Sequence, residues 1–61
     1  MELEEGLEFY RRCLEHCDEV IASLYARQDL PKERKMALID RQLDTRNWLV
    51  KTIEQIEELL S

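Results

Sequence analysis

Apolar residues recur at alternating steps of four and three along most of this chain, and one short break divides the pattern in two. The apolar positions of the first stretch are Leu3, Leu7, Tyr10, Leu14, Cys17, Ile21 and Leu24. A heptad spacing of this kind places all of them on one face of a helix. The break is Asp29-Leu30-Pro31, which contains the only proline. The pattern predicts a helix over about residues 2–28, a turn at 29–31 and a second helix over about 31–60.

The break also predicts how the two helices are arranged. Asp29 or Leu30 is expected to cap the second helix, and Pro31 suits its first position, where a missing N–H costs nothing. A connection this short makes consecutive helices antiparallel neighbours. The predicted fold class is therefore all-α: an antiparallel two-helix hairpin that forms a single domain over residues 1–61.

The second helix has more apolar surface than one neighbouring helix can cover. Its expected seam toward the first helix is Met36, Ile39, Leu43, Arg46, Val50, Ile53, Glu57 and Leu60. A second, milder strip beside that seam consists of Leu38, Thr45, Leu49, Thr52, Ile56 and Leu59. Trp48 falls still farther round, at about 100° per residue. We therefore expect the hairpin to form a homodimer, a four-helix bundle.

This reading separates a core from an association surface. The residues expected in the core are Leu7, Leu14, Ile21, Leu43, Val50 and Ile53. The residues expected at the protein interface are Met36, Ile39, Arg46, Trp48, Leu49, Ile56 and Leu59. Arg46 lies on an apolar stripe and has three alternatives: an outward position or rim ion pair, a buried pair that sets the register, or a ligand contact. We favour the first.

Length and charge narrow the function. Nine basic and 14 acidic residues give a net charge of −5. Such a balance disfavours direct binding to nucleic acid, where phosphate contacts supply most of the affinity, and it disfavours an anionic membrane surface. Scaffolds as small as 61 residues usually need disulfides, a metal or a second chain. We expect a second chain.

The two cysteines indicate a cellular compartment but no chemistry. Cys13 and Cys17 lie one helical turn apart, which does not suit a disulfide. Reduced thiols and an acidic start of the chain, without a signal peptide or a membrane-spanning run, favour a cytoplasmic protein. His16 beside them suggests a zinc site, but a structural site takes four ligands. We therefore expect no metal, no cofactor and no enzymatic activity.

The charges are sorted along the expected hairpin. An acidic patch at the open end would consist of Glu2, Glu4, Glu5, Glu8, Glu54, Glu57 and Glu58. Basic residues gather at the turn, namely Arg27, Lys32, Arg34 and Lys35. We expect a partner hairpin to lie antiparallel, so that each basic turn approaches the other acidic end.

Two architectural resemblances follow from these features. The hairpin resembles ROP-type dimeric hairpins, which form four-helix bundles and bind RNA; no residue motif carries over, and the acidic balance counts against RNA. Residues 31–60, from Pro-Lys-Glu-Arg-Lys-Met-Ala-Leu-Ile through Ile-Glu-Glu-Leu-Leu, resemble the dimerisation helix that ends MerR-type regulators. That resemblance covers half of the chain with generic coiled-coil residues.

The function expected from the sequence is a non-enzymatic protein–protein interaction module. It would be a small dimeric regulator, adaptor or chaperone-like subunit that associates through the second helix, with itself and with another protein. One alternative is a small acidic inhibitor that blocks a basic, nucleic-acid-binding protein surface with the glutamate patch. Another is the dimerisation fragment of a larger transcription regulator.

Overall fold

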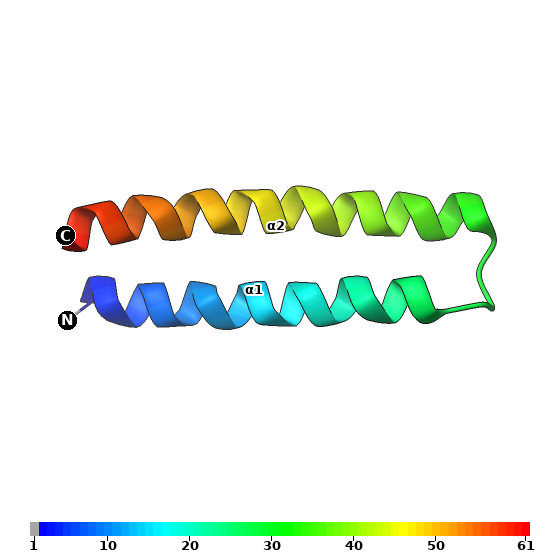
Figure 1. Cartoon of the computed structure of the whole chain (residues 1–61), viewed down its shortest axis with the longest axis horizontal. Helices are drawn as coiled ribbons and strands as arrows, with labels where there is room; N and C mark the ends of the chain where they lie inside the picture. The colour runs from blue at the N-terminus through cyan, green and yellow to red at the C-terminus, as the bar shows by residue number, and fades with distance from the viewer. Residues whose placement is uncertain (1) are drawn as a thin grey trace.

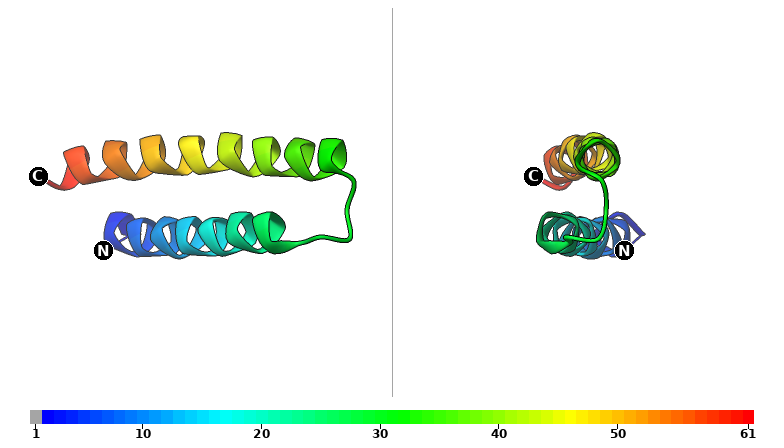
Figure 2. Two further views of the ribbon diagram at one scale, coloured as in Figure 1. Left: turned by 45° about the vertical axis from the view of Figure 1, so that its right-hand side comes forward. Right: turned by 90° about the vertical axis from the view of Figure 1, so that its right-hand side faces the viewer.

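The computed structural model describes residues 2–61, and within that range it shows two helices and no strand. Helix α1 spans Glu2–Ala26 and helix α2 spans Lys32–Leu60. The helices lie side by side and antiparallel, so that the start of α1 and the end of α2 share one end of the molecule (Figure 1). We call this the open end, and we call residues 27–31 the turn. Viewed end-on, the helices cross at a small angle (Figure 2), as heptad seams usually do.

A lysine from α2 completes the end of α1. The helix stops at Ala26, two residues before the expected boundary, and the Arg27 N–H donates to the Leu24 carbonyl at 3.3 Å. The Lys35 ammonium donates to the carbonyls of Tyr25 at 2.7 Å and Arg27 at 2.8 Å. Because the last carbonyls of a helix have no partner within it, Lys35 supplies the donors that a terminal glycine motif would otherwise provide.

The start of α2 differs from the expected cap. Pro31 precedes the helix, with φ −57° and ψ 143°, and no side chain caps it. The Pro31 carbonyl accepts the Lys35 N–H at 2.9 Å. The Asp29 carboxylate instead accepts two bonds from the Arg27 guanidinium, at 2.9 and 2.6 Å. The expectation that Asp29 or Leu30 caps α2 with Pro31 inside the helix is therefore wrong.

The core lies along one line between the helices. The buried residues of α1 are Leu7, Cys17 and Leu24, and those of α2 are Ile39, Leu49 and Ile53. Ile39 is fully enclosed. The expected seam of α1 is thus present in part: Tyr10, Leu14 and Ile21 are half-buried, but Leu3 is 41% exposed. The expected seam of α2 is partly wrong, because Leu43 is 39% exposed whereas Leu49, which was placed on the outer strip, is only 4% exposed.

The register of α2 follows from where its polar residues can go. The buried and half-buried stripe is Lys35, Ile39, Gln42, Arg46, Leu49, Ile53, Ile56 and Leu60. This stripe keeps Glu57 exposed, where its carboxylate pairs with Arg11. It also brings Gln42 to the thiol of Cys17. A seam through Leu43, Val50 and Glu57 would have placed the Glu57 carboxylate against apolar side chains, which is costly for an unpaired charge.

Candidate protein-interaction surface

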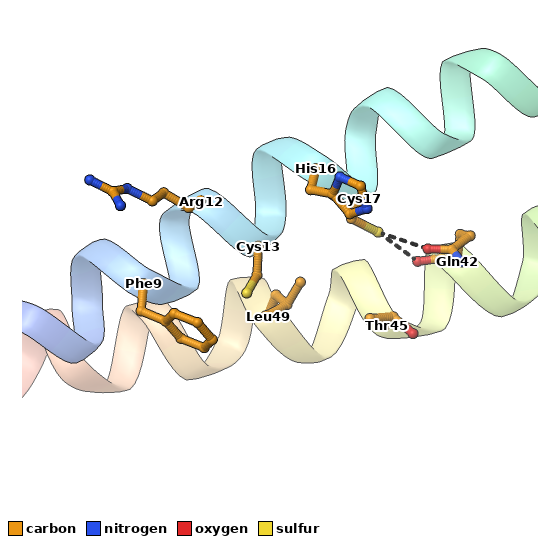
Figure 3. A pocket seen from close by; sticks show the side chains of 8 residues that line it. All are labelled: Phe9, Arg12, Cys13, His16, Cys17, Gln42, Thr45 and Leu49. Carbon is orange, nitrogen blue, oxygen red and sulfur yellow. Dashed lines mark hydrogen bonds between the residues drawn. The ribbon is translucent and has the colours of Figure 1, made fainter.

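An open groove runs between the helices on one side of the hairpin (Figure 3). Its volume is about 550 Å³. The lining residues are Phe9, Arg12, Cys13, His16 and Cys17 from α1, and Gln42, Thr45 and Leu49 from α2. Most of this lining is apolar, and the Arg12 side chain points away from the groove (Figure 3). The arrangement offers a shallow apolar depression rather than a pocket with converging reactive groups.

The floor of the groove holds one polar link between the helices. The Cys17 thiol donates toward the backbone carbonyl of Gln42 at 3.3 Å and toward its side-chain oxygen at 3.4 Å. Burial raises the pKa of Cys17, the Asp18 carboxylate raises this pKa further, and Arg46 opposes both. Because the thiolate is the nucleophilic form, Cys17 has a structural role here.

Aromatic rings extend the groove across the surface. The rings of Phe9 and Tyr10 are 5.7 Å apart and those of Tyr10 and Trp48 are 5.9 Å apart, both edge-on, which is a favoured aromatic geometry. Phe9 is nevertheless 62% exposed and Trp48 is 57% exposed. Trp48 lies one turn from Thr45 and hence on the same side of α2. We call this side, with Phe9, Cys13, Thr45, Trp48 and Leu49, the groove face.

Ion pairs cover the other side of the hairpin. Arg11 pairs with Glu57 at 3.3 Å, and Arg46 pairs with Asp18 at 2.7 Å. Arg11 is two residues from Cys13, and at about 100° per residue it projects to the opposite flank of α1. We call this side, with Arg11, Asp18, Arg46 and Glu57, the ion-pair face. The rim ion pair favoured for Arg46 is confirmed.

The structure divides the residues expected at the interface. Met36, Trp48 and Leu59 are exposed, and Arg46 and Ile56 are half-buried against α1. Ile39 and Leu49 are buried inside the hairpin, where Leu49 forms part of the groove floor. The sequence reasoning gave no interface role to Phe9 or Cys13. The signal in the sequence is that Phe9, Cys13 and Val20 widen the apolar stripe of the first helix on one flank.

The acidic patch lies at the open end, and each of its seven glutamates is exposed. Glu8 pairs with Arg12 at 2.8 Å and Glu57 pairs with Arg11 at 3.3 Å. Within residues 2–61, no group of three potential metal ligands comes together. In the same range, neither helix has a stretch long and apolar enough to cross a membrane.

Comparisons with protein-family models, with curated proteins and with solved structures find no match for this chain. The resemblances to ROP-type hairpins and to the MerR dimerisation helix therefore carry no assignment.

Proposed function

We propose that this chain is a non-enzymatic protein–protein association module and that a second copy completes it as a four-helix bundle. The observation that supports the proposal is the groove face, where Phe9 and Trp48 remain more than half exposed. A hairpin of two helices has no third element to cover such a surface. Contiguous exposed apolar patches on a small protein typically mark association sites, and Trp is enriched among the residues that dominate interface energies.

The magnitudes are consistent with association. A Phe or Trp side chain buries roughly 150–250 Å², and about 25 cal/mol is gained per Å² of apolar area removed from water. Covering the exposed part of Phe9 or Trp48 would therefore contribute on the order of 2–3 kcal/mol per ring. Two rings from each copy approach the estimated cost of association, roughly 4–15 kcal/mol. The aliphatic residues beside them must supply the surplus.

Sedimentation equilibrium tests this proposal. We expect the wild-type chain to sediment as a dimer, and the double variant Phe9→Ala with Trp48→Ala to shift strongly toward monomer. Tyr25→Ala is the matched control, because Tyr25 is 58% exposed and lies seven residues from Asp18, on the ion-pair face. The control should associate like the wild type. A wild-type chain that remains monomeric at high concentration, or equal weakening by both variants, would contradict the proposal.

The acidic patch favours a second candidate function, a small inhibitor of a basic protein surface. Within residues 2–61, no ion pair engages Glu2, Glu4, Glu5, Glu54 or Glu58. Binding to immobilised polylysine, followed over increasing salt, provides the test. An electrostatic inhibitor should be released as screening shortens the range of its charges. Retention that does not change with salt, or with Glu54→Gln and Glu58→Gln, would argue against it.

A further inference from the structure

We propose that the second copy docks antiparallel on the groove face, about a two-fold axis that crosses the middle of both helices, near Cys13 and Trp48. This inference rests on the proposed function, because it names the face and the orientation through which the four-helix bundle would form. In this arrangement α1 packs on the α1 of the partner and α2 on its α2. Three independent features of the hairpin support it.

The first feature is the position of the groove along the molecule. Its lining runs from Phe9 to Cys17 on α1 and from Gln42 to Leu49 on α2. Both segments are centred close to the midpoints of helices that span Glu2–Ala26 and Lys32–Leu60. A two-fold axis through the groove therefore overlays the two hairpins along their whole length and leaves no end unpaired.

The second feature is the set of residues that α1 presents on this face. Gly6, Cys13 and Val20 follow each other at heptad spacing, and an axis at Cys13 places Gly6 against the partner's Val20. A Cβ added at Gly6 would meet nothing within 4 Å, so the hairpin itself does not require glycine there. In the dimer the small residue makes room for the branched one. By the same symmetry, Phe9 faces the groove floor at the partner's Cys17, and each ring enters the groove of the other copy.

The flank of α2 has the same symmetry. Its residues on this face are Leu38, Thr45, Thr52 and Leu59, also at heptad spacing. An axis between the two threonines, beside Trp48, pairs Leu38 with the partner's Leu59. Leu59 is the most exposed large hydrophobic side chain in residues 2–61, at 71%, and this pairing would cover it. The Tyr10–Trp48 ring contact places Trp48 beside Tyr10, three residues from Cys13, so the axes inferred from α1 and α2 lie within about one helical turn of each other.

The third feature is charge. Residues 2–8 and 54–61 contain seven glutamates and no lysine or arginine. Beside the turn, in the first residues of α2, Lys32 and Arg34 are exposed, and within residues 2–61 neither takes part in an ion pair. The antiparallel dimer brings these cations toward the partner's glutamates, whereas a dimer with both turns at one end would set glutamates against glutamates. Complementary charge of this kind fixes orientation more than affinity.

Thiol cross-linking tests the face and the orientation together. A disulfide requires Cα atoms about 4.4–6.8 Å apart, which Cys13 and the partner's Cys13 reach only when they lie on the axis. We would treat Cys17→Ser, which retains Cys13, with copper phenanthroline in air. Oxygen then accepts the two electrons and two protons that the thiols lose. Most of the chain should become a covalent dimer. Cys13→Ser is the matched control, because Cys17 is buried at the groove floor, and it should stay uncross-linked.

A third variant reports the opposite orientation. Cys13→Ser with Cys17→Ser and Asp29→Cys carries its only thiol at the turn, so it should cross-link only if two turns lie together. Efficient linking of this variant, or a dimer by sedimentation in which Cys13 does not link, would overturn the inference and leave the proposed function standing. A wild-type monomer by sedimentation would overturn both. Linking through Cys13 alone, with a dimer by sedimentation, is the expected result.

Discussion

The groove face and the ion-pair face are formed by the same two helices, but different kinds of side chain cover the seam between the helices on each face. On the ion-pair face, Arg11–Glu57 and Arg46–Asp18 bridge the helices with side chains that remain about half exposed. Such pairs contribute little free energy of folding, but their long stems cover the apolar seam and keep charge in water. On the groove face no charged pair crosses between the helices in residues 2–61, and Phe9 and Trp48 remain uncovered.

This difference shows how an incomplete fold can direct association. If both faces carried ion pairs, the hairpin would have a thin core and no exposed apolar surface on either face. A partner would then have no preferred side on which to bind. If both faces were apolar, it would associate in several ways. Ion pairs that bridge one face, and an apolar groove without such pairs on the other, favour docking on the groove side, in the way that specificity arises from disfavoured alternatives as well as favoured contacts.

The largest effect is expected from a pair of leucines on opposite flanks of the α2 seam. Leu49→Ala removes a buried side chain at the groove floor and should lower the free energy of unfolding by about 2–5 kcal/mol. Leu43→Ala removes the same atoms at a site that is 39% exposed, and it should cost about 1 kcal/mol or less. Urea denaturation followed by circular dichroism, at one fixed chain concentration, measures both. Equal losses would mean that the seam predicted through Leu43 is the one that packs.

The same two leucines show which parts of the fold can be predicted from the sequence. The two helices, the break and the seam of α1 follow from spacing, because α1 has one apolar stripe and no competing one. In α2, Leu43 and Leu49 belong to stripes that share Ile39 and Ile53 and differ by only a small rotation. The spacing of apolar residues fits both stripes equally well. Which stripe of α2 packs depends on the side chains of α1 that lie opposite it: Arg11 pairs with Glu57, and Cys17 contacts Gln42. The spacing of residues within α2 alone does not contain that information.

The turn and the groove were missed for a similar reason. Lys35 reaches the carbonyls of Tyr25 and Arg27 from the other helix, so no capping signal lies next to the end of α1 in the sequence. The groove combines Phe9 and Cys13 from one helix with Thr45 from the other. Each is unremarkable on its own helix, and they form a surface only when the register is known.

The rates at which the two cysteines react with a thiol reagent test which of them lies at the groove floor. Cys17 is buried, and its pKa is raised mainly by that burial, so less thiolate is present and less of it is accessible. At chain concentrations low enough to favour the monomer, we expect Cys13→Ser, which leaves Cys17, to react with a thiol-specific disulfide reagent more slowly than Cys17→Ser, which leaves Cys13. In denaturant the two rates should become similar. Faster reaction of Cys17 in the folded chain would contradict the structure of the groove floor.

A smaller effect is expected on the ion-pair face. A double-mutant cycle with Asp18→Ala and Arg46→Ala should give a coupling free energy of about 0.2–1 kcal/mol, the range of exposed pairs. The coupling should shrink in high salt because both side chains reach solvent. Neither variant should change the dimer fraction in sedimentation equilibrium. Loss of dimer in either single variant would mean that the ion-pair face, rather than the groove face, carries association.

The smallest effect concerns the turn, where the bonds from Arg27 lower the pKa of Asp29 to about 2 from its ordinary value of 3.8. A carboxyl whose pKa is lower in the folded chain stabilises the fold above the unfolded value and loses that contribution as the pH falls through the folded value. The window is therefore about pH 3.8 to 2. Because Asp29 is exposed, we expect a local change without global unfolding.

The side-chain carboxyl resonance of Asp29 should titrate near pH 2 in the wild type and closer to the ordinary value in Arg27→Gln. A wild-type midpoint already at the ordinary value would show that the Arg27–Asp29 bonds do not persist in solution. Both faces of the hairpin would be unaffected by that result, since neither depends on this pair.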